Sequence, residues 1–166
     1  MSEGLLLLRL VVGLLMAAHG AQKLFGWFGG HGLAGTTGFL EALGFRPGRF
    51  FATTASASEI ASGVLVVLGL FGPVGPALMV SVMIVAAISV HWEHGVFAMT
   101  NGIEVPLLYA AAATALALTG PGAFSLDAAL GLASVWTPAL RLTTLAIAVV
   151  AAIGNLAIRR PASVSA

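Results

Sequence analysis

The sequence contains no cysteine and little charge. Only 8% of its 166 residues are Asp, Glu, Lys or Arg, whereas 59% belong to the hydrophobic set. A soluble domain carries roughly 25% charged residues, so this composition, with a mean hydropathy of +1.05, predicts a membrane protein. Without cysteine there is no disulfide, no thiolate nucleophile and no cysteine-ligated cluster. Any redox chemistry therefore needs a bound cofactor or a partner protein.

The chain also lacks a strong charge of either sign. Its formal net charge is +1, and its seven Lys and Arg residues are scattered. They form no phosphate-binding patch, so we do not expect nucleic acid as a partner. The N-terminal run has no basic region ahead of it, and Arg9 interrupts its leucines. We interpret this run as a retained first span and not as a cleaved signal.

Long apolar runs set the predicted architecture, because a spanning helix takes about 20 mainly apolar residues. The breakers GPVGP, residues 72–76, leave room only for a tight hairpin between two such runs. We therefore predict an all-α, polytopic transmembrane helical bundle with a four-helix core and a fifth, C-terminal transmembrane helix. The five predicted spans are residues 4–24, 50–71, 74–92, 103–118 (short, with Pro106 near its start) and 138–158.

Two connections are less polar than ordinary loops. Residues 25–49 combine aromatics with many glycines, so we expect them at the membrane interface or re-entering the bilayer, with one amphipathic helical turn at residues 39–43. Residues 120–136 carry Ser125 and Asp127 ahead of a short apolar stretch. This pattern predicts an N-capped helix that lies along the membrane.

The positive charges near the span ends predict the orientation. The side with the long first loop and the C-terminus has five positive charges, and the other side has two. If Lys23 belongs to a site and is not counted, the first side has four. The excess favours a cytoplasmic first loop and C-terminus, with the N-terminus outside. The two groups are Lys23, Arg46, Arg49, Arg159 and Arg160 on the first side, and Arg9 and Arg141 on the second.

Helix parity brings the unusual polar residues to one end of the bundle. The end of span one, the start of span two, the end of span three and the start of span four lie on the same face of the membrane. These segments carry His19, Gln22 and Lys23, then Ser56 and Glu59, then His91, Glu93 and His94, and finally Asn101 and Glu104.

Glu59 is the most unusual member of this group. It lies about nine residues into its span, roughly 13 Å along the helix axis, where an ionised carboxylate must be paired, protonated or facing water. Helical spacing places Lys23 on one stripe with Arg9, Gly13, Met16 and Gly20, with His19 at its margin. A corresponding stripe of span two holds Thr53, Ser56, Glu59 and Gly63, so Glu59 can meet Lys23 or His19 if the two spans are neighbours.

Each candidate also has a structural interpretation. Lys23 and Arg9 could be snorkelling cations, and Arg9 could instead satisfy carbonyls inside the bundle. His91 and His94 could be ordinary interfacial residues, or metal ligands at i and i+3 completed by His19, His31 or Glu59. Because that spacing is common by chance, we predict no metal site. For Glu59 we favour a functional role over a buried ion pair that only locks the bundle.

Four stretches together resemble the DoxX family of bacterial and archaeal integral membrane proteins. They are LLRLVVGLLMAAHGAQKLFGWFGGHGLAGTTGFLEALGF, ASEIASGVLVVLGLFGP, AAISVHWEHG and TGPGAFSLD, between residue 5 and about residue 127. The resemblance implies a four-helix membrane bundle with recurring polar residues at Arg9, His19, Lys23, Glu59 and His91. It also implies quinone-linked oxidation, as a small subunit of an oxidase or oxidoreductase, or a role in oxidative-stress assemblies, with more distant relatives acting as chaperones or cargo receptors.

The chain departs from the family pattern after TGPGAFSLD, where it adds another apolar span. We therefore divide it into residues 1–127, a DoxX-like four-helix membrane domain, and residues 128–166, which hold an interfacial segment, the extra transmembrane helix and a short C-terminal tail. The extra helix could dock a partner. The expected location is the bacterial plasma (inner) membrane.

Three functions remain open from the sequence. The first is a redox accessory or quinone-site subunit, with Glu59, His19, Lys23 and His91 as catalytic candidates and Arg9, His19, Lys23 and Glu59 as cofactor-binding candidates. The second is a non-catalytic scaffold or assembly factor, and the third a small transporter, which the absence of inverted repeats disfavours. Quinone is the cofactor that the resemblance implies, and no haem, flavin or iron-sulfur signature is present in the sequence. The expected partners are the lipid bilayer and either other subunits or further copies of the chain.

Overall fold

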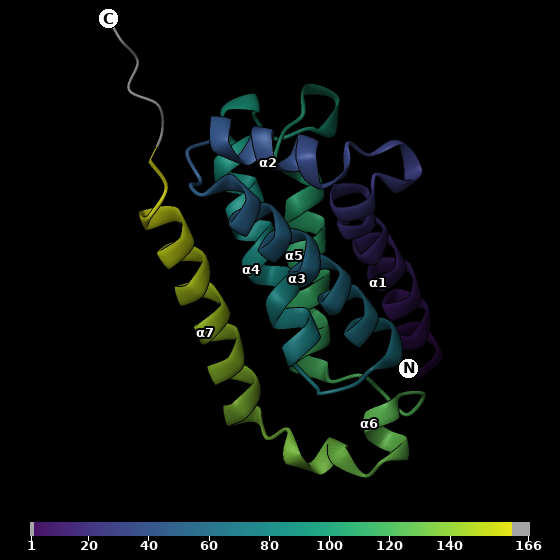
Figure 1. The fold of residues 1–166 in the computed structure, drawn as a ribbon. Helices are drawn as coiled ribbons and strands as arrows, with labels where there is room; N and C mark the ends of the chain where they lie inside the picture. The colour runs from purple at the N-terminus through teal and green to yellow at the C-terminus, as the bar shows by residue number, and fades with distance from the viewer. Residues whose placement is uncertain (1, 161–166) are drawn as a thin grey trace, which may run out of the picture.

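A computed structural model describes residues 2–160, which form helices joined by short turns and include no strand. The predicted all-α bundle is confirmed (Figure 1). Four helices pack as its core: α1 (Ser2–Phe25), α3 (Gly48–Leu68), α4 (Val74–Ala86) and α5 (Glu104–Thr119). Their buried cluster includes Met16, Val66, Met79 and Leu116. A fifth helix, α7 (Pro138–Ala157), packs on the outer side of α4.

Four helical segments of the described chain are long and apolar enough to cross a membrane: α1, α3, the run Val74–His94 that begins with α4, and α7. The fifth, α5, is apolar but has only 16 residues. At 1.5 Å per residue it is about 24 Å long, shorter than a hydrocarbon core of about 30 Å. The short fourth span predicted from the sequence therefore corresponds to a real but short helix.

Close contact between α1 and α3 positions the polar residues. A Cβ atom at Gly13 would lie 2.7 Å from the Gly63 carbonyl oxygen, and one at Gly20 would lie 2.7 Å from that of Ser56. Only glycine permits this approach of the two backbones. The facing stripes predicted from helical spacing are thus confirmed, apart from Thr53, which is exposed.

The predicted tight hairpin joins α3 to α4 and is held by the segment that follows α5. The buried Asp127 carboxylate accepts hydrogen bonds from the Phe71 amide at 2.9 Å and the Gly72 amide at 2.6 Å. Its own amide donates to the Gly69 carbonyl at 3.0 Å. The predicted N-cap is also confirmed, since Ser125 Oγ accepts from the Ala128 amide at 3.2 Å. The capped helix, α6 (Leu126–Ala129), has only four residues.

The first connection contains more helix than the sequence predicts. The single turn expected at residues 39–43 is the end of α2 (Gly32–Ala42), an 11-residue helix that packs across α3 and α1. The Thr36 and Thr37 hydroxyls donate to carbonyls one turn back, Gly32 at 2.9 Å and Leu33 at 2.7 Å. Tertiary packing thus overrides the weak helix propensity of the glycines in this segment.

The C-terminal end of α7 is fixed to the turn between α2 and α3. Arg159 Nε donates to the Leu43 carbonyl at 2.6 Å, and the Arg160 amide donates to the Gly44 carbonyl at 2.9 Å. These bonds hold the end of α7 at the same end of the bundle as α2 (Figure 1). The predicted short tail, residues 161–166, lies outside the described residues.

Candidate ligand-binding site

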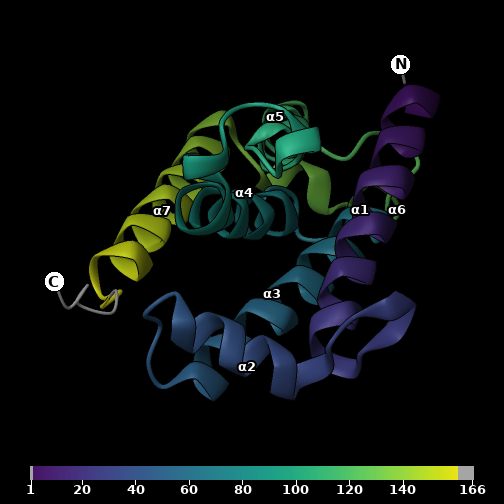
Figure 2. The ribbon, with the colours of Figure 1, turned by 90° about the horizontal axis from the view of Figure 1, so that it is seen from above.

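The structure confirms that the ends of α1 and α4 and the starts of α3 and α5 meet at one end of the bundle (Figure 1). Seen along the bundle, α2 and α3 lie on one side and α4 on the other, with α7 beyond α4 (Figure 2). The segments that carry the predicted site residues of α1, of α3 and of the continuation of α4 therefore lie at the same end of the bundle.

Lys23 and Glu59 form an ion pair between α1 and α3. Lys23 Nζ donates to Glu59 Oε1, and the Glu59 side chain is 1% exposed whereas that of Lys23 is 38% exposed. Glu59 lies 11 residues after the start of α3, about 16 Å along the axis. Pairing with a cation offsets the cost of a carboxylate at this depth. The contact predicted from the two helical stripes is thus present, with Lys23 and not with His19.

A cavity of about 170 Å³ adjoins this pair. Lys23 and Glu59 line it together with side chains from α2, α3, α4 and α7, so that each of these helices contributes to its wall. An engineered apolar cavity of about 150 Å³ is large enough to hold benzene. The apolar lining residues are Phe39, Leu40, Leu43, Phe45, Phe51, Ala55, Leu78, Val82, Val85, Ala86 and Val90, and the remaining polar ones are Thr36, Thr54, Ser58, Ser81, Ser89 and Asn155.

Two buried polar atoms of the lining residues have no hydrogen-bond partner in the described part of the chain. They are Glu59 Oε2 and Ser89 Oγ, in residues that are 0% and 9% exposed. Buried polar groups are normally paired, and leaving one unpaired costs about 1–3 kcal/mol. A molecule in the cavity is placed to supply the missing partners.

Ser89 lies in an irregular part of its helix. It belongs to a π-helical turn, Ala87–His91, that continues α4, and such turns are frequent at functional sites. By contrast, the hydroxyls of Ser56 in α3 and Thr114 in α5 each donate to the carbonyl four residues earlier, at 2.6 and 2.8 Å.

His19 lies one helical turn before Lys23 but faces another helix. Its ring packs edge-on against Tyr109 of α5, with ring centroids 5.9 Å apart. Tyr109 lies close enough to Glu59 for an electrostatic interaction. His19 thus contacts Tyr109 and does not line the cavity.

His91 ends the π-turn and is also outside the cavity lining. Its Nδ1 lies 2.7 Å from the Asn101 carbonyl oxygen, so it fixes the loop between α4 and α5. His94 Nδ1 contacts the Val90 carbonyl at 3.0 Å. Within residues 2–160 no three ligating side chains are grouped to hold a metal ion.

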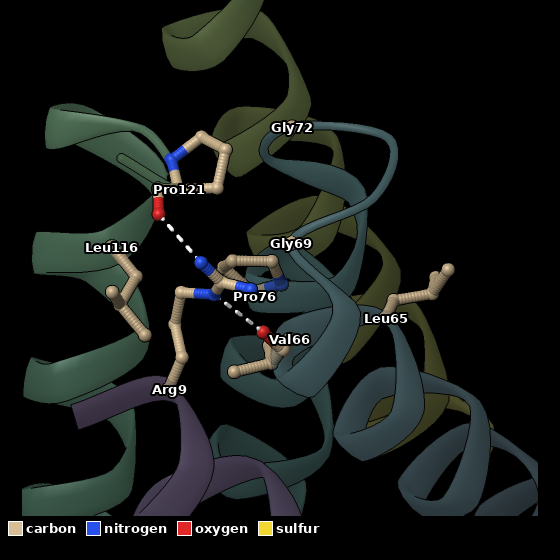
Figure 3. A pocket seen from close by; sticks show the side chains of 8 residues that line it. All are labelled: Arg9, Leu65, Val66, Gly69, Gly72, Pro76, Leu116 and Pro121. Carbon is tan, nitrogen blue, oxygen red and sulfur yellow. Dashed lines mark hydrogen bonds between the residues drawn. The ribbon is translucent and has the colours of Figure 1, made fainter. Parts of the chain in front are cut away.

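Arg9 lies apart from the other candidates, at the opposite end of α1. Arg9 is 2% exposed, and its guanidinium donates to four carbonyl oxygens, of which those of Val66 and Pro121 are drawn in Figure 3. Two of these carbonyls belong to the last turn of α3 (Val66 and Val67), and two to the segment after α5 (Pro121 and Phe124). Arg9 therefore connects α1 with the end of α3 and with the segment that follows α5. The distances are 2.9 Å to Val66, 2.7 Å to Val67, 2.8 Å to Pro121 and 2.6 Å to Phe124. The adjoining space is only about 10 Å³, which is room for no more than one water molecule.

Three residues near the site were not predicted from the sequence: Ser89, Tyr109 and Asn155. Ser89 stands in an apolar run and gives no signal, because the π-turn is not visible in the sequence. Tyr109 is the only tyrosine of the chain, which was a possible signal. Asn155 brings α7 to the cavity wall, and its position depends on the packing of α7 against α4.

The arrangement combines an acid, a base and an apolar cavity at one end of a helical membrane bundle. Long apolar helices with buried polar residues between them define a small multi-pass membrane protein.

The family follows from comparison with known proteins. The DoxX family model matches residues 4–92, more than half of the chain, and the protein belongs to this family. The match includes Arg9, His19, Lys23, Glu59 and His91 and ends before α5. It is shorter than the resemblance noted in the sequence, which extends to TGPGAFSLD. No curated protein and no solved structure matches the chain.

Proposed function

We propose that the protein is a small membrane subunit of a quinone-linked or oxidative-stress-related oxidoreductase assembly, and that the cavity beside Lys23 and Glu59 binds the quinone ring. The observation that carries the proposal is this cavity itself, because it joins an apolar wall to a buried acid and a cation. Small-molecule sites have this composition: mostly apolar, with a few placed polar groups.

The ion pair suits the polar chemistry of a quinone. An ammonium group has three N–H donors, and Glu59 accepts one from Lys23, which leaves others for a quinone carbonyl oxygen. Glu59 is a carboxylate that can take up a proton when the ring is oxidised and return it on reduction. Tyr109, which interacts electrostatically with Glu59, and His19, which packs on Tyr109, are further proton-bearing groups.

The chain's own residues do not provide an electron carrier. It has no cysteine for an iron-sulfur cluster and no haem or flavin motif in its sequence. In this proposal the electrons pass between the quinone and a partner subunit. The assembly lies in the bacterial inner membrane, with the α2 end of the bundle in the cytoplasm.

The test is mass spectrometry of the small molecules and proteins that co-purify from native membranes in mild detergent. Glu59→Gln removes the charge of the cavity carboxylate, and Glu104→Gln is the matched control, because Glu104 lies at the same end but bonds the Ala98 amide and is outside the cavity. The proposal expects stoichiometric quinone with wild type and the control, and its loss with Glu59→Gln. A partner retained equally by all three, with no quinone in any, would instead show a scaffold.

A further inference from the structure

We infer that Ser89 and Glu59 together bind a hydroxyl-bearing ring, so that the cavity selects a ligand that donates a hydrogen bond over one that only accepts. The inference rests on the proposed function, because it assumes that the cavity holds a ring. It adds Ser89 as a binding residue and names the chemical class of ligand that the two side chains favour.

The first step concerns Glu59. A carboxylate paired with an ammonium group is an acceptor only. Its Oε1 is used by Lys23, and its Oε2 is buried with no donor among the described residues. Only a ligand with an O–H or N–H group can complete this oxygen. A quinone carbonyl placed there would bring two acceptors together, whereas a hydroquinone hydroxyl would donate.

The second step concerns Ser89. Its hydroxyl can both donate and accept, and within the described residues it lacks the intrahelical bond that Ser56 and Thr114 make. Ser89 belongs to the continuation of α4 and Glu59 to α3, and both line the same cavity. A ligand between these helices therefore meets an obligate acceptor on one wall and a hydroxyl on another.

The third step concerns the rest of the cavity. Charged groups other than Lys23 and Glu59 are absent from its described lining, which is otherwise apolar or neutral. The ligand is therefore uncharged, with hydroxyl groups as its polar part. The cavity volume of about 170 Å³ is enough for one ring, since an apolar cavity of about 150 Å³ holds benzene. Any long apolar tail of the ligand must lie outside the cavity.

The test measures binding of two probes to the purified full-length chain in detergent. One probe is a decyl-substituted benzohydroquinone, kept reduced without oxygen, and the other is its dimethyl ether, which has the same ring but cannot donate. Ser89→Ala is compared with Thr114→Val, which removes a hydroxyl that already has a partner in α5 and lies outside the cavity.

Wild type and Thr114→Val should bind the hydroquinone about tenfold or more tightly than the ether, as one hydrogen bond to a charged group predicts. Ser89→Ala should lose about fivefold or more in hydroquinone affinity, yet unfold at the wild-type temperature, because the Ser89 hydroxyl has no protein partner to lose. Equal binding of the two probes, or unchanged hydroquinone affinity in Ser89→Ala, would overturn the inference and leave the proposed function standing. Failure of wild type to bind either probe or the parent quinone would overturn both.

Discussion

Arg9 and Lys23 are two cations on one helix, and the structure satisfies them in different ways. The Arg9 guanidinium donates to four backbone carbonyls, whereas Lys23 pairs with the buried Glu59. The guanidinium fork suits several fixed acceptors, while an ammonium group acts as a point charge. Arg9 thus has a structural role in the fold, and Lys23 remains available to a ligand.

Replacement of Arg9 by lysine should destabilise the protein although the charge is kept. Lysine has fewer donors and no planar fork, so it leaves buried carbonyls such as that of Val66 without a partner. We expect a loss of about 2–4 kcal/mol, seen as a lower midpoint of thermal unfolding in detergent. Arg141→Lys is the control, because the Arg141 guanidinium donates to one carbonyl oxygen of the described residues, that of Leu118 at 2.8 Å. Equal midpoints for the two variants would contradict this role.

The Lys23–Glu59 pair should show coupling in a double-mutant cycle. Lys23→Met leaves a buried carboxylate without its cation, and Glu59→Gln leaves the cation without its carboxylate. Each single change should cost about 1–3 kcal/mol, after allowance for the part-exposed Lys23. The double variant should cost less than the sum of the two, as measured by unfolding midpoints. Strict additivity would mean that the pair contributes no interaction energy.

At this scale the sequence predicts what depends on helical spacing. Lys23 and Glu59 could be paired from their stripes because α1 and α3 are regular helices that are neighbours in sequence and in space. Ser89 could not be found, since it lies in a π-turn that no local pattern predicts. His19 faces Tyr109 because α5 approaches α1, a contact between distant parts of the chain. The catalytic roles of Glu59, His19, Lys23 and His91 stay predictions, as does cofactor binding by Arg9.

Among the helices, α7 is the least embedded in the bundle. Its buried residues are Ala148 and Ala152, and its C-terminal end is held to the α2–α3 turn by Arg159 and by the Arg160 amide. Because Asn155 of the same segment lines the cavity, these bonds also fix one part of the cavity wall.

Removal of the Arg159 side chain should loosen this end of α7 without unfolding the core. In Arg159→Ala, amide hydrogen exchange of residues 154–160 should become faster, by about tenfold if one hydrogen bond to a charged group is lost. Exchange in α1 and α3 should be unchanged. Arg141→Ala removes the comparable bond at the other end of α7 and serves as the control. No acceleration in Arg159→Ala would show that packing on α4 alone holds the end of α7.

Element boundaries were predictable where a local signal sets them. Asp127 and Ser125 marked α6, and the breakers marked the α3–α4 hairpin, because caps and prolines act within a few residues. The length of α2 was not predictable, because its glycines favour no structure until the helix packs across α3. The extent of α7 followed from hydropathy alone, since α7 lies largely outside the core.

The whole molecule is asymmetric between its two ends. The cavity, α2 and the C-terminal end of α7 lie at one end, and α6 with the N-terminus at the other (Figure 1). Five of the seven Lys and Arg residues belong to the first end by their positions in the sequence. The positive-inside rule therefore predicts that the end with the cavity is cytoplasmic.

Because the chain has no cysteine, single-cysteine labelling can test this orientation directly. Thr100→Cys places a thiol on the exposed loop between α4 and α5, and Ser134→Cys places one on the exposed segment after α6. In intact cells a membrane-impermeant maleimide should label the cysteine at 134 and leave that at 100 unlabelled until the membrane is permeabilised. The reverse labelling pattern would contradict the predicted orientation.

The central claim is that the cavity beside Lys23 and Glu59 binds a quinone, and photo-crosslinking in native membranes tests it most directly. A quinone with a photoreactive group on its ring is irradiated with the full-length protein, and the modified peptides are sequenced by mass spectrometry, with and without excess unmodified quinone. The account predicts adducts on cavity residues, such as Phe51, Glu59 and Val82, which the excess quinone prevents. Adducts confined to lipid-facing residues such as Val150 and Ile153, unaffected by competition, would contradict it.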